Sequence, residues 1–533
     1  MDANTSLLPY RDDEDLERRD EEGGVRAKSP SSFDGGASRR CFQLPCRGRW
    51  GDTLGWLGSK CRLIVTSVAI VALFGFLILA FIFASPIFRG SRPCYTGFDG
   101  YQCHPKISHF WGQYSPYFSL GHVSEISPEI PGGCDITFVQ LLSRHGARYP
   151  TEFKTEVYAD LISEIQSNAT TYHGGFTFLK DFEYSLGADD LTAFGETQMV
   201  DSGSTFYQRY KDLAQHTVPF IRASGSDRVI VSAEKFIEGF HTVKKEDPLS
   251  MKNDSVPVVG VVISEEPESN NTLNHGTCDE FDSDRYLSNY AQELFLNVFA
   301  PPIQTRVNAN LPGANVTLDS IPYLMDLCSF QTIADTSDAS KLSPFCSLFT
   351  EPEWVEYDYY QSVGKYYGYG SGHPLGPTQG VGFVNELIAR LTSSPIRGHA
   401  SINRTLDEDS ETFPLNASMY ADFSHDNTMT SIYAALGLYN DTAPLSKTSL
   451  QTVEETKGYS TSWTVPFAGR AYIEKMECSG EDEELVRVLV NERVVPLHGC
   501  EVDELGRCKL DDFVDGLTFA RNGGHWGKCL ADP

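Results

Sequence analysis

The chain has 533 residues, of which 41% are hydrophobic and 12% aromatic, and its formal net charge is −29. A chain of this length and apolar content can bury a large core, which excludes disorder of the whole. The acidic charge disfavours nucleic acid as a partner, and it requires any phosphate site to be a locally basic pocket.

Residues 1–62 hold eleven basic and eleven acidic residues, so the whole excess of negative charge falls on the rest of the chain. They are rich in Asp, Glu, Arg, Gly, Ser and Pro and show no hydrophobic periodicity. This composition predicts a disordered cytosolic tail.

The next segment, residues 63–84, runs for 22 residues without a charge. At about 1.5 Å per residue it can cross a hydrocarbon core of roughly 30 Å, so we predict a transmembrane signal-anchor helix, followed by a stalk at 85–93. A cleaved signal peptide is the alternative, but the segment is longer than the apolar core of such a peptide and no Ala-x-Ala site follows it. Basic residues crowd its N-terminal side, which predicts a single-pass type II protein whose residues after the helix are extracellular or lumenal, at the plasma membrane, vacuole or Golgi.

Three of the thirteen cysteines precede this segment and ten follow it. An even number on the translocated side predicts five disulfides, although parity alone leaves their pairing open. Sequons that can accept N-linked glycans on the same side begin at Asn168, Asn253, Asn270, Asn315, Asn403, Asn416 and Asn440.

From residue 94 onward, the hydrophobic pattern is that of a mixed α/β protein without a repeat of fixed period. Residues 135–142 and 419–423 are predicted as buried strands. A helix follows the second strand, with Asp426 or Asn427 as its cap. Helical stretches at 287–300 and 384–391 predict a smaller helical domain inserted between the strands near 143 and 424.

The first strand leads directly into Arg144-His145-Gly146-Ala147-Arg148, which places a guanidinium group on either side of an imidazole. Two arginines can bind phosphoryl oxygens as forks, Gly146 allows the backbone to approach the anion, and an unprotonated imidazole nitrogen can attack phosphorus. The alternative is a surface turn with incidental basic residues, but this combination is rare by chance. The motif therefore predicts a phosphate site with His145 as the nucleophile.

The second strand leads into His425-Asp426-Asn427, again where a strand gives way to a helix, which is where α/β folds gather ligand groups. Taken alone, these residues could be a helix cap with a neighbouring imidazole. Beside the first motif, Asp426 suits a general acid that protonates the leaving alkoxide. His425, Asn427 and the helix N-terminus would then bind the phosphoryl oxygens.

These motifs resemble those of the histidine acid phosphatases, and the similarity to the fungal phytase branch extends across residues 94–529. Shared segments include WGQY at 111–114, SLGADDLT at 185–192, FIEGF at 236–240, SPFC at 343–346 and NERVVPLHGC at 491–500. The resemblance implies a phosphoglycerate-mutase-like fold, with a mixed-sheet α/β domain and a smaller helical domain over the site. It implies a phosphohistidine at His145, phosphate clamping by Arg144 and Arg148, and a third clamping arginine at Arg228, which the residues alone would place in a strand.

The same resemblance implies the cysteine pairing: Cys94 with Cys103, Cys134 with Cys478, Cys278 with Cys529, Cys328 with Cys346, and Cys500 with Cys508. Several lysines rim the pocket in phytases that prefer inositol hexakisphosphate. Lys154 and Lys365 are kept as substrate-binding residues, whereas Glu156, Val157 and Gly364 stand where lysines are common. Fewer cations should weaken the binding of a polyanion more than that of a monoester.

We therefore predict a phosphomonoester hydrolase, either a phytase or an acid phosphatase of broad specificity, that acts on inositol phosphates or other organic phosphates. No metal or other cofactor is expected, because the guanidinium groups supply the positive charge. One alternative is a phosphoglycerate-mutase-like phosphotransferase, which shares the Arg-His-Gly turn. The other is a receptor or adhesion protein on a catalytically inactive phosphatase scaffold.

Overall fold

The computed structural model describes residues 93–529 except 252–255, 267–268, 285, 335–339 and 399. The predicted tail at 1–62 and the predicted transmembrane helix at 63–84 lie outside the described residues, and so does the predicted stalk except for Pro93. Within the described ranges, no helix is long and apolar enough to span a membrane.

A mixed sheet forms the centre of the described residues, and its eight strands run in the order β10-β8-β7-β3-β6-β4-β5, with β9 paired to β8. β3, β6, β4 and β5 are parallel to one another, whereas β7 pairs with β3 in the antiparallel sense. The predicted strands at 135–142 and 419–423 lie within β3 and β6, which are neighbours. The strands are β3 (Cys134–Arg144), β4 (Phe220–Ser224), β5 (Val259–Ile263), β6 (Met419–Ser424), β7 (Arg470–Cys478), β8 (Leu485–Val490), β9 (Arg493–Val494) and β10 (Cys508–Lys509), with a separate pair of β1 (Tyr95–Thr96) and β2 (Gly100–Tyr101).

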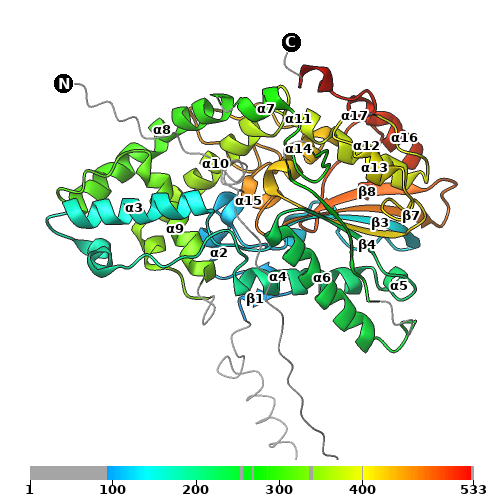
Figure 1. Cartoon of the computed structure of the whole chain (residues 1–533), viewed down its shortest axis with the longest axis horizontal. Helices are drawn as coiled ribbons and strands as arrows, with labels where there is room; N and C mark the ends of the chain where they lie inside the picture. Colours follow the sequence, from blue (N-terminus) through cyan, green and yellow to red (C-terminus); the bar gives the residue numbers. More distant parts are fainter. Residues whose placement is uncertain are drawn as a thin grey trace, which may run out of the picture. The chain divides into compact units, whose positions relative to one another are not determined.

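Helices cover both faces of this sheet. The longer ones are α3 (Glu152–Asn168), α4 (Ala193–Arg209), α6 (Asp227–Glu246), α8 (Tyr286–Asn310), α9 (Ser320–Ala334), α10 (Glu351–Gly368), α12 (Val381–Leu391) and α14 (Asp426–Ala435). The shorter ones are α2 (Pro105–Ser108), α5 (Lys211–Ala214), α7 (Asp279–Ser283), α11 (Gly376–Gln379), α13 (Arg404–Asp407), α15 (Thr461–Thr464), α16 (Leu510–Gly516) and α17 (Thr518–Arg521). Figure 1 shows α4 and α6 on one side of the sheet and α12, α16 and α17 on the other.

The side chains of β3 show why helices cover both faces of the sheet. Val139 belongs to a buried cluster with Phe236 of α6, whereas its neighbour Phe138 belongs to a second cluster with Leu387 of α12. Successive side chains of a strand point to opposite faces, so β3 is apolar on both, as expected for a central strand of an α/β sheet.

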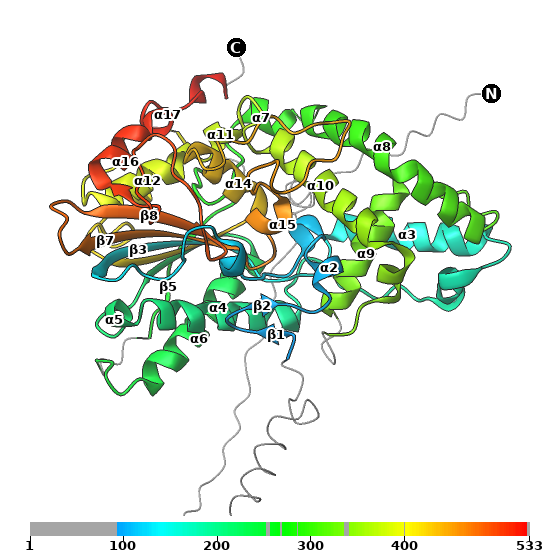
Figure 2. The same cartoon turned by 180° about the vertical axis from the view of Figure 1, so that it is seen from behind.

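A group of helices, α3, α8, α9 and α10, gathers beside the sheet (Figures 1 and 2). The predicted helix at 287–300 lies in α8 of this group, whereas the one at 384–391 lies in α12, which packs on the sheet. β4 and β5 also lie between β3 and β6 in the chain. The residues between the two motif-bearing strands therefore build part of the sheet as well as the helical region.

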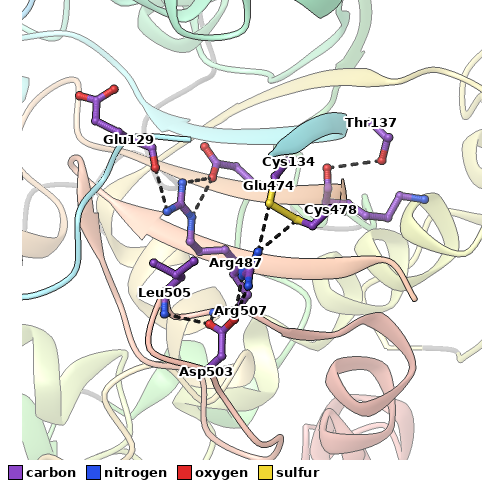
Figure 3. The surroundings of a disulfide bond; sticks show 10 residues. Glu129, Cys134, Thr137, Glu474, Cys478, Arg487, Asp503, Leu505 and Arg507 are labelled. Atoms are coloured by element: carbon purple, nitrogen blue, oxygen red, sulfur yellow. Dashed lines mark hydrogen bonds and ion pairs between the residues drawn. A yellow bond between two sulfur atoms is a disulfide. The ribbon is translucent and has the colours of Figure 1, made fainter. Parts of the chain in front are cut away.

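Five disulfides tie the described residues together, and they are the pairs that the resemblance implies: Cys94–Cys103, Cys134–Cys478, Cys278–Cys529, Cys328–Cys346 and Cys500–Cys508. Cys134–Cys478 joins the start of β3 to the end of β7 (Figure 3). The guanidinium Nη1 of Arg507 lies 3.1 Å from each sulfur of this bond, and its other nitrogens bind Asp503. The central antiparallel pair is thus fastened at the end opposite to the Arg144-His145 turn.

Candidate active site

The candidate site lies where the parallel strands end at the same level of the sheet. In the register of the sheet, Arg144 of β3 is opposite Ser424 of β6, and Ser224 of β4 is opposite Ile263 of β5. The residues that follow these strands therefore converge on one edge, which is the usual place for ligands in open α/β sheets.

His145 follows β3 and is fully buried. Its backbone N–H donates to the Ser424 carbonyl at 3.2 Å, and its ring Nδ1 lies 2.8 Å from the carbonyl oxygen of Gly146. Because a carbonyl can only accept, Nδ1 carries the hydrogen, and Nε2 holds the lone pair when the ring is neutral. The ring centroid lies 5.7 Å from that of His425. The two predicted motifs thus meet through their histidines.

The turn after His145 is held against the start of α4. A Cβ at Gly146 would lie 2.4 Å from the carbonyl oxygen of Gly195, so only glycine fits there. The Gly146 N–H donates to Ser232 Oγ at 3.0 Å, and the Ala147 N–H donates to Gln198 Oε1 at 3.0 Å. Besides the predicted approach of an anion to Gly146, the close contact with Gly195 gives a packing reason for glycine, and it fixes the turn.

Asp426 is the first residue of α14 and lies between two cations. Its Oδ2 is 3.1 Å from Arg144 Nη2 and 3.1 Å from Lys365 Nζ, and its Oδ1 accepts from the Asn427 N–H at 2.9 Å. Lys365 also donates to Asn427 Oδ1. The N-cap residue of α14 is His425, so the predicted cap at Asp426 or Asn427 was wrong by one or two positions.

The three predicted clamping arginines are all buried. Besides Asp426, Arg144 binds the carbonyl oxygens of Gln113 and Val465, which orients its guanidinium group. Arg148 Nη1 donates to the Tyr149 carbonyl at 2.8 Å. Arg228 lies in the first turn of α6, so placing it in a strand, as the residues alone suggested, was wrong. A run of β-branched residues in a helix accounts for that error.

Glu265, which no sequence motif predicts as a site residue, contacts His425. Its Oε1 lies 2.8 Å from His425 Nε2 and also accepts from the Ser224 hydroxyl. Burial would raise the pKa of Glu265, but His425, the Ser224 hydroxyl and the Arg228 charge together lower it to about 2. The sequence does hold one signal for Glu265: it lies two residues after the Val-rich run of β5. It is therefore a polar residue at the end of a third parallel strand.

Lys154, predicted to bind substrate, is buried in the first turn of α3. Its Nζ lies 3.5 Å from Asp326 Oδ2 and 4.7 Å from the centroid of the Tyr323 ring. Tyr158 donates to the same Asp326 oxygen at 2.7 Å. Among the described side chains, no group of three or more His, Cys, Asp or Glu is arranged to hold a metal ion.

Comparisons with known proteins agree with this geometry. The family described as histidine phosphatase superfamily (branch 2) matches residues 135–491. Phytase A of Aspergillus oryzae is 59% identical over 440 residues, which cover 83% of this chain and 94% of that protein. Phytase A of Aspergillus fumigatus is 58% identical over 448 residues, which cover 84% and 96% of the two chains.

A solved structure, the phytase from D. castellii, shares the fold with a TM-score of 0.61 at 22% identity, covering 80% of this chain and 88% of that one. The predicted family is therefore confirmed by sequence, and the mixed-sheet α/β fold by structure. This chain belongs to branch 2 of the histidine phosphatase superfamily and is an enzyme of its histidine acid phosphatase type.

Proposed function

We propose that this enzyme hydrolyses phosphomonoesters, with inositol phosphates as its substrate class, through a phosphohistidine at His145. The observation that carries the proposal is the meeting of His145 with His425 and with the Arg144–Asp426–Lys365 group at one edge of the sheet. The relatives named Phytase A, at 58–59% identity, support the substrate class. No specific observation favours the phosphotransferase or the adhesion protein.

In the first step, Nε2 of His145 attacks phosphorus, a P–N bond forms, and the ester P–O bond breaks. The hydrogen bond from Nδ1 to the Gly146 carbonyl keeps the attacking nitrogen unprotonated and supports the positive charge that the ring gains. Asp426 gives its proton to the departing oxygen. Arg144, Arg148, Arg228 and His425 stabilise the charge on the phosphoryl oxygens.

The proton on Asp426 must be accounted for, since Arg144 and Lys365 both lie 3.1 Å from its Oδ2 and favour the ionised carboxylate. A phosphomonoester has a second pKa near about 6, so below that pH it brings a proton into the site. This supports an acidic optimum. In the second step, water attacks phosphorus, the P–N bond breaks, and Asp426 takes the proton of the water.

The test compares the wild type with His145→Ala on phytate and p-nitrophenyl phosphate at several pH values. We expect turnover of both substrates to fall by at least about 10⁴-fold, because the nucleophile is lost. Brief incubation with ³²P-labelled substrate followed by denaturation should label the wild type with an acid-labile, alkali-stable phosphate, and leave the variant unlabelled. Label in the variant, or wild-type turnover without label, would contradict the phosphohistidine.

Substrate preference depends on the rim of the site. Glu156 is exposed and Val157 half-buried where phytases that prefer inositol hexakisphosphate often have lysine. With fewer cations, the enzyme should discriminate less strongly between a polyanion and a simple monoester. Val157→Lys should therefore lower KM for phytate several-fold and leave KM for p-nitrophenyl phosphate nearly unchanged. Equal changes for both substrates would contradict this role of the rim.

The predicted membrane topology also remains a proposal. The uncharged run at 63–84 with basic residues before it supports a single-pass type II protein, and the five disulfides support an extracellular or lumenal catalytic domain. Full-length protein in microsomes should resist extraction by alkaline carbonate. Protease added outside should remove an N-terminal tag and spare the catalytic domain, and the opposite pattern would reverse the proposed orientation.

A further inference from the structure

The chemistry described above assigns no role to Glu265, although this carboxylate is paired with His425. Both side chains are largely buried, with 3% of the His425 side chain and 21% of the Glu265 side chain exposed. Glu265 is held on several sides, because the Ser224 hydroxyl donates to Oε1 and the Ser226 N–H reaches the same oxygen at 3.2 Å. Asn271 in turn donates to Ser224 Oγ at 3.0 Å. The carboxylate is therefore a fixed part of the site.

Two groups from other parts of the fold lie near the His425–Glu265 pair. The His145 ring approaches from the β3 turn, and the Arg228 charge acts on the same carboxylate from α6. The adjacent carboxylate of Asp426, on α14, is already paired with Arg144 and Lys365. Among these charged groups, Glu265 is the carboxylate that the structure places against the His425 ring.

Hydrogen-bond chemistry then fixes the role of each ring nitrogen. An ionised carboxylate can only accept, so Nε2 of His425 carries the hydrogen that Glu265 receives. When the ring is an imidazolium, Nδ1–H is the remaining ring donor for a phosphoryl oxygen. A donor with positive charge binds such an oxygen more strongly than a neutral one, and the gain is largest in the transition state.

We propose that Glu265 is a positioning residue that keeps His425 as an imidazolium, with Nδ1–H directed at the phosphoryl group. This inference rests on the proposed function, because it assigns His425 to the phosphoryl oxygens. Since the pKa of Glu265 is about 2, the carboxylate stays charged throughout the acidic range in which the enzyme should work. The pair therefore sets the upper pH limit of phosphate binding.

The decisive variant is Glu265→Gln, which keeps the size and a hydrogen-bonding oxygen but removes the charge. We expect the alkaline limb of the kcat/KM profile with p-nitrophenyl phosphate to move down by about one pH unit or more. The loss in kcat/KM should accordingly be larger at pH 6 than at pH 3. Competitive inhibition by inorganic phosphate should weaken in the same pH-dependent way.

Two further variants separate this role from mere packing. Glu266→Gln removes the same charge one residue away on the exposed surface, and it should leave the profile unchanged. Glu265→Asp retains a carboxylate on a shorter side chain, and it should restore much of the alkaline limb even where kcat stays low. In NMR titrations, the His425 imidazole should keep its proton to a higher pH in the wild type than in Glu265→Gln.

A uniform loss of kcat in Glu265→Gln, with an unshifted profile and an unshifted His425 titration, would overturn the inference. If Glu265→Gln fails to fold, the profile of Glu265→Asp and the wild-type titration decide the question. A wild-type His425 that titrates like a free imidazole would also overturn it. If the wild type shows no hydrolysis, the proposed function fails, while the titrations still test the pair.

Discussion

Two aspartates four positions apart have different environments. Asp422 lies inside β6, where Arg222 contacts its two oxygens at 2.9 Å each and Arg390 contacts Oδ2 at 2.7 Å. Asp426 lies just after the strand, where Arg144 and Lys365 contact one oxygen. Both carboxylates are buried and paired with cations. The difference between them lies in what surrounds each pair.

The two groups of charges lie at different places in the sheet. Around Asp422, the cations Arg222 and Arg390 face the carboxylates of Asp422 and Glu386, so the charges are equal in number. At the strand ends, Arg144 and Lys365 both contact Asp426, and the Arg228 charge acts on Glu265. This edge of the sheet is the usual place for ligands in open α/β folds. Buried arginine alone therefore does not indicate an anion site, whereas cations gathered where parallel strands end do.

The largest expected effect that tests this contrast comes from Asp426→Asn. Loss of the general acid should lower kcat by about 10²–10⁴-fold for alkyl phosphates, because their alkoxides leave poorly without a proton. For p-nitrophenyl phosphate, whose leaving group needs less protonation, the loss should be smaller. Steady-state kinetics on both substrates, with Tm as the folding control, measure the difference. An equal loss for the two leaving groups would argue against proton donation by Asp426.

The second effect concerns stability instead of turnover. Asp422→Ala leaves Arg222 and Arg390 buried without their shared partner, which should cost about 3–5 kcal/mol. Burial would raise the pKa of Asp422, but the two arginines lower it, so the carboxylate is charged in the folded protein. Urea unfolding should show the loss, whereas kcat per folded molecule should stay within a few-fold of the wild type. A stable variant with little turnover would show that the contrast between the two aspartates is wrong.

The contrast also explains what the sequence could predict. The strands that end at Arg144 and just before Asp426 were evident, because each is a buried apolar run that ends abruptly in polar residues, and such ends meet in a parallel sheet. Arg222 and Asp422 gave no signal, because a polar residue within a strand shows its partner only once the register across strands is known. Glu265 belongs to no motif and depends on a third strand end. The family resemblance supplied Arg228, which local pattern alone assigned to the wrong type of element.

The smallest expected effect tests the balance of charges around Asp422. Asp407 of α13 lies beside this group, and burial together with repulsion by Glu386 raises its pKa to about 8, although Arg222 and Arg390 oppose the rise. In the unfolded chain an aspartate ionises near about pH 4. Between these values the folded protein holds one more proton than the unfolded chain, so its stability falls as the pH rises.

For this single group, the slope of the unfolding free energy should reach about −1.4 kcal/mol per pH unit, and Asp407→Asn should remove it. Urea unfolding of wild type and variant between pH 4.5 and 7.5 measures the slope, with Glu408→Gln on the surface as the control. As the pH rises, the wild type should therefore lose stability relative to Asp407→Asn. Parallel pH dependences would mean that Asp407 is charged in the folded protein, and that three carboxylates there are held by only two arginines.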